Sequence, residues 1–148
     1  MLNNPFWRKH VITQYFWKNP QMYHQFGWKW HNGIDFRCNK HIVFATHEGI
    51  CRVVRSTAGY GNHVYIIRMS HDWGYETIYG HLSDIFVKDG QKVTTRTAIG
   101  KSGNTGNSTG PHLHFWLRFL NSNMTQRDKW NGYDGYIDPL PYFLAWKI

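Results

Sequence analysis

Short apolar runs separated by glycine-containing turns make up most of the chain after residue 40. Each run is rich in β-branched and aromatic side chains, and no stretch keeps the 3.6-residue period of a long helix. The runs lie at residues 42–45, 50–54, 62–69, 75–79 and 112–117, with shorter pieces near 86–87, 92–93 and 99. This pattern predicts a largely antiparallel β domain. The unbroken apolar run at residues 64–67 predicts strands that are buried on both faces.

The two ends of the chain have a different pattern. The first 30 residues are aromatic and irregular, with Pro5 and Pro20 as breakers. We expect their rings to pack on the core or to line a groove, with core packing for most of them; the rings are those of Trp7, Tyr15, Phe16, Trp17, Tyr23, Phe26, Trp28 and Trp30. Residues 121–135 are polar and carry glycine and asparagine, which predicts a long surface loop. The prolines that follow predict a single helical turn. Because no repeat or linker interrupts the chain, we expect one domain spanning residues 1–148.

The composition adds a marked charge imbalance. The chain has 17 Lys and Arg against 9 Asp and Glu, a formal net charge of +8 with the histidines neutral. Such a balance favours an anionic partner, and it does not choose among nucleic acid, a membrane surface and an anionic cell wall. Aromatic residues make up 18% of the chain, which gives large side chains to both the core and the surface.

No stretch has the features of a targeting or membrane segment. The N-terminus lacks an apolar core and a small-residue cleavage site, so we expect no signal peptide. No apolar run approaches the length that spans a membrane, so we expect no membrane insertion. If the protein acts outside a cell, something else must carry it there.

The two cysteines, Cys38 and Cys51, do not form a disulfide framework. We interpret them as free thiols, with a single bridge between them as the alternative. A cysteine-based zinc site is disfavoured, because neither cysteine belongs to a C-x-x-C motif.

The candidate chemistry centres on His112 and His114. They begin a β-prone run that follows a polar, glycine-rich loop at residues 103–110. Because successive side chains of a strand point to opposite faces, both imidazoles lie on one face. Two imidazoles at the end of a strand, next to a flexible loop, suit a metal site or a proton-transfer site.

His31, Asp35 and His81 are the further candidates. In an extended conformation His31 and Asp35 project from the same face, because they are four residues apart. Catalytic zinc sites typically use three protein ligands of these types and leave one position for a water, whose pKa falls from about 16 toward 7. Three ligands and two free histidines would use all five groups. Spacing alone does not decide which of His112 and His114 binds the metal.

The remaining histidines do not belong to a motif that contains a second candidate metal ligand or catalytic residue. A lone histidine is usually a surface residue or a core residue with satisfied hydrogen bonds. We therefore expect ordinary structural roles for the other six, which are His10, His24, His41, His47, His63 and His71.

Several short motifs occur in order along the chain. They are His31-Asn32-Gly33-Ile34-Asp35-Phe36, Gly59-Tyr60-Gly61-Asn62, Tyr79-Gly80-His81-Leu82-Ser83, Ser108-Thr109-Gly110-Pro111-His112-Leu113-His114-Phe115 and Ile137-Asp138-Pro139. Together they resemble the lysostaphin-type zinc metallopeptidases, which cut peptidoglycan cross-links. The resemblance covers about residues 26–144, preceded by a wrapping segment at residues 1–25. It implies a compact, all-β, antiparallel fold, barrel- or sandwich-like, with a narrow groove that holds one zinc ion.

Carried over by position, the resemblance assigns a role to each candidate residue. The H-x-x-x-D motif makes His31 and Asp35 zinc ligands, and the second histidine of H-x-H, His114, would be the third. His81 and His112 would be the catalytic pair, which act as acid/base and as oxyanion stabiliser beside the activated water. All five positions are intact, which favours an active enzyme.

Three features depart from the family pattern. Arg96 and Thr97 stand where the family usually has a glycine, and the loop at residues 121–135 is longer than usual. The aromatic N-terminal segment has no counterpart, so the resemblance assigns no role to Tyr23 or Trp28.

The resemblance and the charge together set the expected partners. We expect cross-link peptides of bacterial peptidoglycan as the substrate, anionic cell-wall polymers as a further partner, no nucleic acid, and a monomer. The alternative is a non-catalytic cell-wall-binding module of the same fold, whereas a nucleic-acid binder has no supporting motif. The missing signal peptide and the short length suggest a phage-encoded wall hydrolase, in the virion or released at lysis. A domain of a secreted enzyme is the alternative origin.

Overall fold

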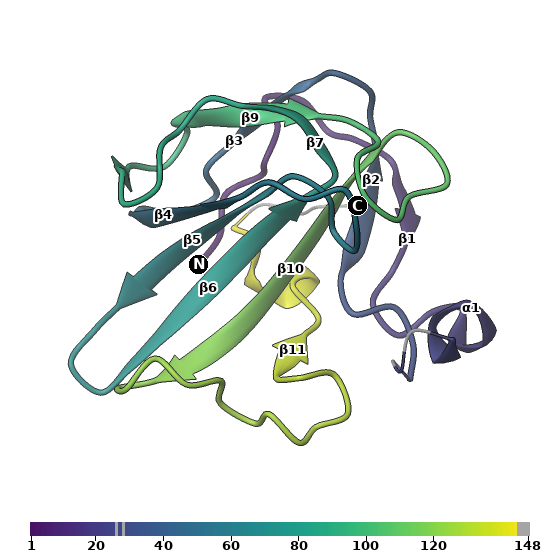
Figure 1. Cartoon of the computed structure of the whole chain (residues 1–148). Coiled ribbons are helices and arrows are strands. Elements are labelled where there is room, and N and C mark those ends of the chain that lie inside the picture. The colour runs from purple at the N-terminus through teal and green to yellow at the C-terminus, as the bar shows by residue number, and fades with distance from the viewer. Residues whose placement is uncertain (26, 28, 145–148) are drawn as a thin grey trace.

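Antiparallel pairing between strands far apart in the sequence organises the fold (Figure 1). The computed structural model describes residues 1–25, 27 and 29–144. The strands are β1 (Ile12–Gln14), β2 (Ile34–Arg37), β3 (Ile42–Phe44), β4 (Gly49–Val54), β5 (His63–Met69), β6 (Trp73–Gly80), β7 (Leu82–Ile85), β8 (Lys92–Val93), β9 (Ala98–Ser102), β10 (His112–Asn121) and β11 (Tyr136–Ile137). The helical elements are α1 (Pro20–His24) and a 3₁₀ turn, η1 (Leu140–Tyr142).

The strands form one large sheet and one small sheet. The large sheet has the order β1-β2-β10-β6-β5-β4-β8, with β11 also paired to β10, and the small sheet has the order β3-β9-β7. Each of these strand pairs is antiparallel, so the predicted all-β antiparallel fold class is confirmed. None of the described helices is long and apolar enough to cross a membrane. The single-domain boundaries stay a prediction.

Strand β10 lies at the centre of the large sheet and is buried on both faces. On one face Phe115 packs against Tyr79 and Phe143, with ring centroids 5.2 and 5.4 Å apart. On the other face Trp116 is fully buried beneath Tyr60. Strand β10 is therefore buried on both faces from residue 113 to residue 117. The predicted burial of both faces is wrong for the run at residues 64–67, because Tyr65 and Ile67 remain partly exposed.

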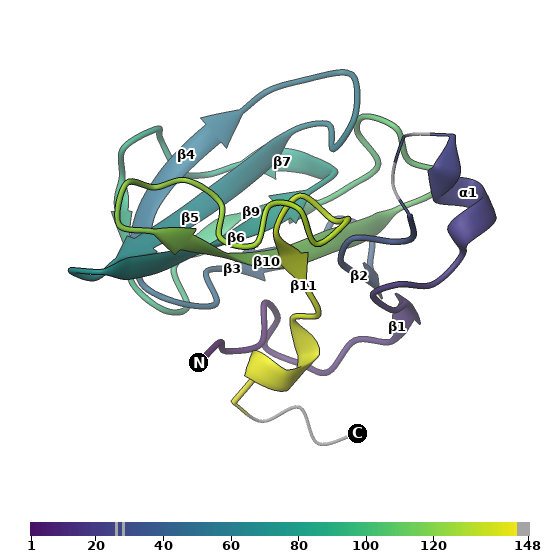
Figure 2. The ribbon, with the colours of Figure 1, turned by 90° about the horizontal axis from the view of Figure 1, so that it is seen from below.

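The N-terminal segment contains more regular structure than its sequence indicates. Strand β1 pairs with β2, and α1 stands to one side of the sheet, next to β1 (Figure 2). These elements have only three and five residues, too few to establish a period in the sequence. The expectation that most of the aromatic rings pack on the core is wrong, because Trp7, Tyr15 and Trp17 are exposed and only Phe16 among the described ones noted is buried. Two further rings, Phe26 and Trp28, lie outside the described residues.

Most predicted strands have observed counterparts, with small differences at their ends. The piece expected near residues 86–87 is wrong, because β7 occupies residues 82–85 and Phe86 is about half exposed beyond it. Residues 122–135 form turns, as the polar composition predicted, and η1 is the helical turn expected after the prolines.

Cys38 and Cys51 are both buried and both free. Burial raises the pKa of each thiol to about 11, so both remain protonated at neutral pH. The alternative of a bridge between them is wrong, and they act as small apolar core residues.

His47 is a buried histidine that belongs to none of the candidate motifs. Its Nδ1–H donates to the carbonyl of Glu48, and its Nε2 lies 2.9 Å from the Thr77 hydroxyl. Burial lowers the pKa of His47 from an ordinary 6.5 to about 4, against the opposing effect of the Glu48 carbonyl. The folded state therefore keeps this imidazole neutral where the unfolded chain would bind a proton.

We expect His47 to make the protein less stable as the pH falls from about 6.5 to about 4. Over that range the unfolded chain binds more protons than the folded one, and below pH 4 the loss is complete. In His47→Gln the free energy of unfolding, measured by urea denaturation, should depend less on pH, by on the order of 3 kcal/mol between pH 7 and pH 4. Parallel pH profiles of the variant and the wild type would contradict this.

Candidate metal centre

The register of the large sheet gathers the candidate residues around His114. In the pairing of β10 with β2, His114 lies opposite Asp35, whereas His112 lies opposite Arg37. In the pairing of β10 with β6, His114 lies opposite Gly80, the residue before His81. Residues separated by more than 30 positions in the chain are thereby placed within one small volume.

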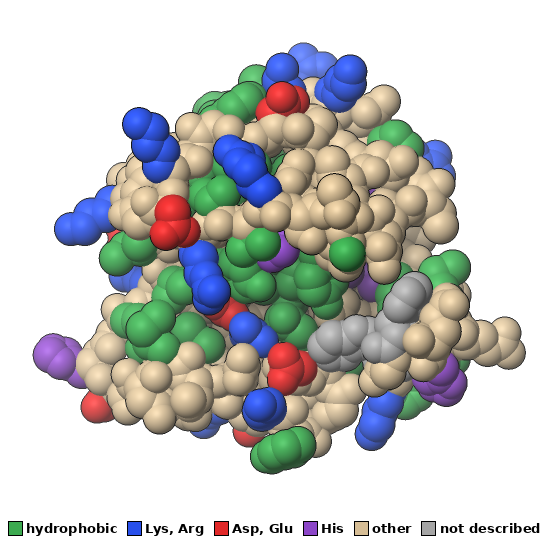
Figure 3. Space-filling view, in the orientation of Figure 1, with side chains coloured by type: hydrophobic (Ala, Val, Ile, Leu, Met, Phe, Trp, Pro, Cys, Tyr) green, Lys and Arg blue, Asp and Glu red, His purple; other side chains and the backbone are tan. Residues whose placement is uncertain are grey.

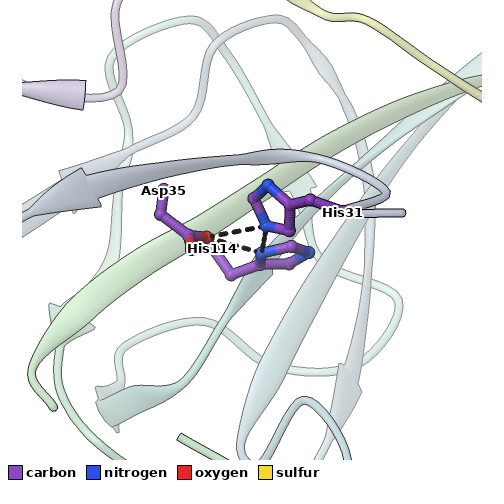
Figure 4. Close-up of side chains that lie close together, drawn as sticks. All are labelled: His31, Asp35 and His114. Carbon is purple, nitrogen blue, oxygen red and sulfur yellow. Dashed lines mark hydrogen bonds and ion pairs between the residues drawn. The ribbon is translucent and has the colours of Figure 1, made fainter. Parts of the chain in front are cut away.

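Three of the candidates form a cluster with ligand-like geometry (Figure 4). Asp35 Oδ1 lies 2.7 Å from His114 Nδ1 and 3.2 Å from His31 Nε2. The two imidazole nitrogens, His31 Nε2 and His114 Nδ1, are 3.0 Å apart. All three side chains are buried, and each directs one donor atom at the other two.

The cluster holds more acceptors than protons. His31 Nδ1–H donates to the carbonyl of Tyr15 at 3.0 Å, which leaves a lone pair on its Nε2. Burial opposes ionisation of Asp35, but the attraction and hydrogen bond of the His114 N–H, and the contacts with His31, outweigh it and hold the pKa of this carboxyl well below its usual range. A single proton on His114 Nδ1 would have to serve two acceptors. A cation at this point satisfies all three atoms, so the residues fit a metal.

His114 is enclosed on both sides of its ring. Burial lowers its pKa to about 3, against the attraction of Asp35, so the imidazole stays neutral and suited to ligation. Tyr60 stacks on one side, with ring centroids 5.5 Å apart and planes at 14°. A Cβ at Gly33 would lie 2.5 Å from the Phe115 carbonyl and 3.1 Å from the His114 ring, so only glycine allows β2 to approach this closely.

His81 and His112 lie next to the cluster, with their ring centroids 4.6 Å apart. The Nδ1–H of His81 donates to the carbonyl of Thr105 at 2.7 Å, and that of His112 donates to the carbonyl of Gly110 at 2.8 Å. Because carbonyls only accept, both rings carry the proton on Nδ1 and keep a lone pair on Nε2. His112 Nε2 lies 3.6 Å from Asp35 Oδ1, at the edge of the cluster of candidate ligands.

Burial also affects the proton affinity of His81. Its pKa falls to about 4 by desolvation, with the Thr105 carbonyl opposing and the neighbouring His112 adding to the shift. His81 is therefore a neutral base at neutral pH, with its ring beside that of His112.

Four of the five candidate residues line one cavity of about 560 Å³. They are Asp35, His81, His112 and His114, and they form its floor. One wall comes from β1 and α1, including Gln14 and Tyr23, and the other from the loops at residues 59–60 and 107–109. Figure 3 shows a hollowed face over the large sheet, with hydrophobic side chains and parts of histidine side chains inside it and basic and acidic side chains running across it.

Sequence reasoning missed several residues that build this cavity. Tyr60 receives a hydrogen bond of 2.6 Å from the Asn32 amide, and both line the cavity beside the predicted residues. Tyr23 lines it as well and is held by Gln14 through a hydrogen bond of 2.8 Å. Asn32 and Tyr60 belong to the motifs already noted, which was the available signal, whereas nothing in the sequence pointed to Gln14.

The other six histidines take no part in the cluster. Among the described residues, the groups that could hold a metal reduce to His31, Asp35 and His114. His47 and His63 are buried with backbone carbonyls as partners, and His10 and His41 hydrogen-bond to each other outside the site.

The chain is similar to a known family of peptidases. The model of Peptidase family M23 matches residues 29–127. The peptidoglycan DD-endopeptidase ShyA of Vibrio cholerae is 46% identical over 88 residues, which cover 59% of this chain and 20% of ShyA. The curated relatives that the chain matches are much longer than it is, and it spans about a fifth to a third of their length.

Solved structures of two peptidases have a fold similar to that of this chain. The catalytic domain of the antimicrobial peptidase lysostaphin from Staphylococcus simulans has a TM-score of 0.72 and 30% identity, and covers 90% of this chain and 91% of that one. A mutant catalytic domain of the prophage-encoded M23 protein EnpA from Enterococcus faecalis has a TM-score of 0.70 and 30% identity. The match covers 95% of this chain and 96% of that domain.

Zinc should bind the metal-free protein with a stoichiometry of about one, and His114→Ala should lose most of that binding, because it removes the candidate ligand between the other two.

Removing the ion with a chelator should lower the melting temperature, since the candidate ligands would tie β10 to β2 and the segment before it. Elemental analysis and thermal unfolding measure both effects.

His63→Ala is the matched control for this prediction. His63 is a buried histidine whose Nδ1–H also donates to a backbone carbonyl, that of Gly61, but it lies outside the cluster. This variant should keep its zinc. Full zinc occupancy in His114→Ala would show that the cluster does not bind the metal.

Proposed function

The chain belongs to peptidase family M23, as its sequence motifs predicted, and from this we propose that it is a zinc-dependent endopeptidase that hydrolyses the peptide cross-links of bacterial peptidoglycan. The observation that carries the proposal is the convergence of His31, Asp35 and His114, with two further histidines beside them in one cavity. The name of ShyA as a peptidoglycan DD-endopeptidase supports the substrate class.

In this proposal His31 Nε2, Asp35 Oδ1 and His114 Nδ1 would hold one zinc ion. When bound, the ion would supply a Lewis acid for the scissile carbonyl and would make a water acidic enough to attack at neutral pH. The buried position of the three ligands limits access to the cavity side, where the peptide enters. The Tyr15 carbonyl fixes the ring of His31, so that its Nε2 stays directed inward.

His81 and His112 would accept and donate protons during hydrolysis. Each presents an unprotonated Nε2, because its Nδ1–H is held by a backbone carbonyl. One Nε2 accepts the proton of the attacking water, and the histidine that has become protonated can then donate to the oxyanion or to the leaving amine. The low pKa of His81, about 4, keeps its ring unprotonated at neutral pH and makes it quick to release a proton once it has gained one.

Other features suit action at a cell wall. The cavity of about 560 Å³ has room for a short peptide segment, and its walls carry amides and hydroxyls that can bind a peptide backbone. The net charge of +8 would attract the protein to anionic wall polymers. A monomer encoded by a phage, in the virion or released at lysis, fits these features, and the similarity to a prophage-encoded domain supports that origin.

His112→Ala and His81→Ala should each keep zinc and fold but lose most activity. A general acid–base group contributes about 10²–10⁴-fold, and an oxyanion donor about 10²–10³-fold. Because both act on one water and one intermediate, the double variant should be only slightly worse than either single one. The measurements are zinc content, circular dichroism and turnover of a soluble cross-linked wall peptide.

His47→Gln serves as the control and should retain turnover, because His47 is bonded to the Glu48 carbonyl and does not line the cavity. Loss of zinc in His112→Ala, or wild-type turnover in His81→Ala, would show that the roles are divided wrongly. A zymogram of purified walls that stays uncleared by the zinc-loaded wild type would instead favour a non-catalytic wall-binding module.

A further inference from the structure

His81 has an unusual backbone conformation for its residue type. It lies between β6 and β7 with φ of 59°, in the left-handed region that favours glycine. A residue persists in such a conformation only when its surroundings hold it there, and these residues cluster at functional sites. The contacts around His81 therefore decide where its imidazole points.

The backbone on both sides of His81 is tied to the loop at residues 60–62. The N–H of His81 donates to the carbonyl of Tyr60 at 2.8 Å, and the N–H of Leu82 donates to the carbonyl of Asn62 at 2.9 Å. These two hydrogen bonds can hold the turn at His81 in place only if the loop at residues 60–62 is itself held in place.

The hydroxyl of Thr105 joins that loop to the turn. It accepts the N–H of Asn62 at 3.0 Å and donates to the carbonyl of Leu82, also at 3.0 Å. A hydroxyl has one proton to give and lone pairs to accept with, so both capacities are used here. The main-chain carbonyl of the same residue accepts the Nδ1–H of His81 at 2.7 Å. Thr105 thus contacts the ring of His81 and fastens the backbone on which the ring stands.

Close packing leaves Thr105 little room to move. A Cβ at Gly61 would lie 2.4 Å from the carbonyl oxygen of Thr105, and one at Gly106 would lie 2.2 Å from the amide nitrogen of Gly61. The N–H of Asn107 also donates to the carbonyl of Gly59 at 2.8 Å. The two loops are therefore held together directly behind His81.

We propose that Thr105 is a positioning residue, which uses its hydroxyl to hold His81 in the left-handed conformation and its carbonyl to keep the proton on Nδ1. This inference rests on the proposed function, in which His81 Nε2 exchanges a proton during hydrolysis. Without the hydroxyl, the Asn62 N–H and the Leu82 carbonyl lose their shared partner, and the turn can relax. The imidazole then no longer presents Nε2 to His112 in one fixed orientation.

The test compares Thr105→Val, which removes the hydroxyl but keeps the shape, with Thr105→Ser, which keeps the hydroxyl. In the zinc-loaded protein, ¹⁵N NMR of the histidine rings should show a single Nδ1–H tautomer for His81 in the wild type and in Thr105→Ser, and a mixture in Thr105→Val. Turnover of a soluble cross-linked wall peptide should fall by about 10–100-fold in kcat for Thr105→Val, because small displacements of a reacting group cost about that much. KM and zinc content should change little.

Thr97→Val is the matched control for loss of a hydroxyl. The Thr97 hydroxyl also accepts a backbone N–H, that of Thr94, but in the turn between β8 and β9. This variant should keep the wild-type His81 signal and kcat. If Thr105→Val does not fold, Thr105→Ala removes the same hydroxyl and carries the same expected results.

Wild-type NMR signals and kcat in the hydroxyl-free variant would overturn the inference. An equal loss in Thr105→Ser would overturn it as well, since that variant keeps the hydroxyl. If the wild type hydrolyses no wall peptide, the proposed function fails, but the tautomer of His81 in the two variants still decides the role of Thr105.

Discussion

The antiparallel pairing of β10 with β2 and β6 is the constraint on which the candidate site depends. It places His114 opposite Asp35 on one side and next to the start of the His81 turn on the other. The strand is buried on both faces, with Phe115 in the core and Trp116 beneath Tyr60, so its register cannot slip without exposing large apolar side chains. The same burial that stabilises the sheet therefore fixes the distances between the candidate metal ligands.

Backbone carbonyls orient the imidazole rings of the candidate site. Three histidines of the site donate Nδ1–H to a main-chain carbonyl. His31 donates to Tyr15 and His81 to Thr105, each on another segment, whereas His112 donates to Gly110, two residues before it. Each bond selects one tautomer and leaves Nε2 unprotonated on the inner side. A carbonyl of the main chain moves less than a side chain, so the rings are oriented by the fold itself.

The N-terminal segment belongs to the site as much as the family-like core does. Its carbonyl at Tyr15 orients His31, and Gln14 holds Tyr23 at the wall of the cavity. A segment that reads as irregular aromatic sequence therefore closes one side of the groove. Its position is set by pairing of β1 with β2, the strand that carries Asp35.

The sequence by itself predicted the fold class and most of the main strands, because short apolar runs and glycine turns are local signals. It also supplied the candidate donor set, through continuous motifs that resemble those of a known family. It also placed His112 and His114 on one strand face. Only the tertiary structure decided that His114, and not His112, lies opposite Asp35, because the register between distant strands is not written in either one. It alone gave β1 and α1, which are too short to show a period, and the left-handed backbone of His81. That conformation is disfavoured for histidine locally and exists because Thr105 and the loop at residues 60–62 hold it from outside.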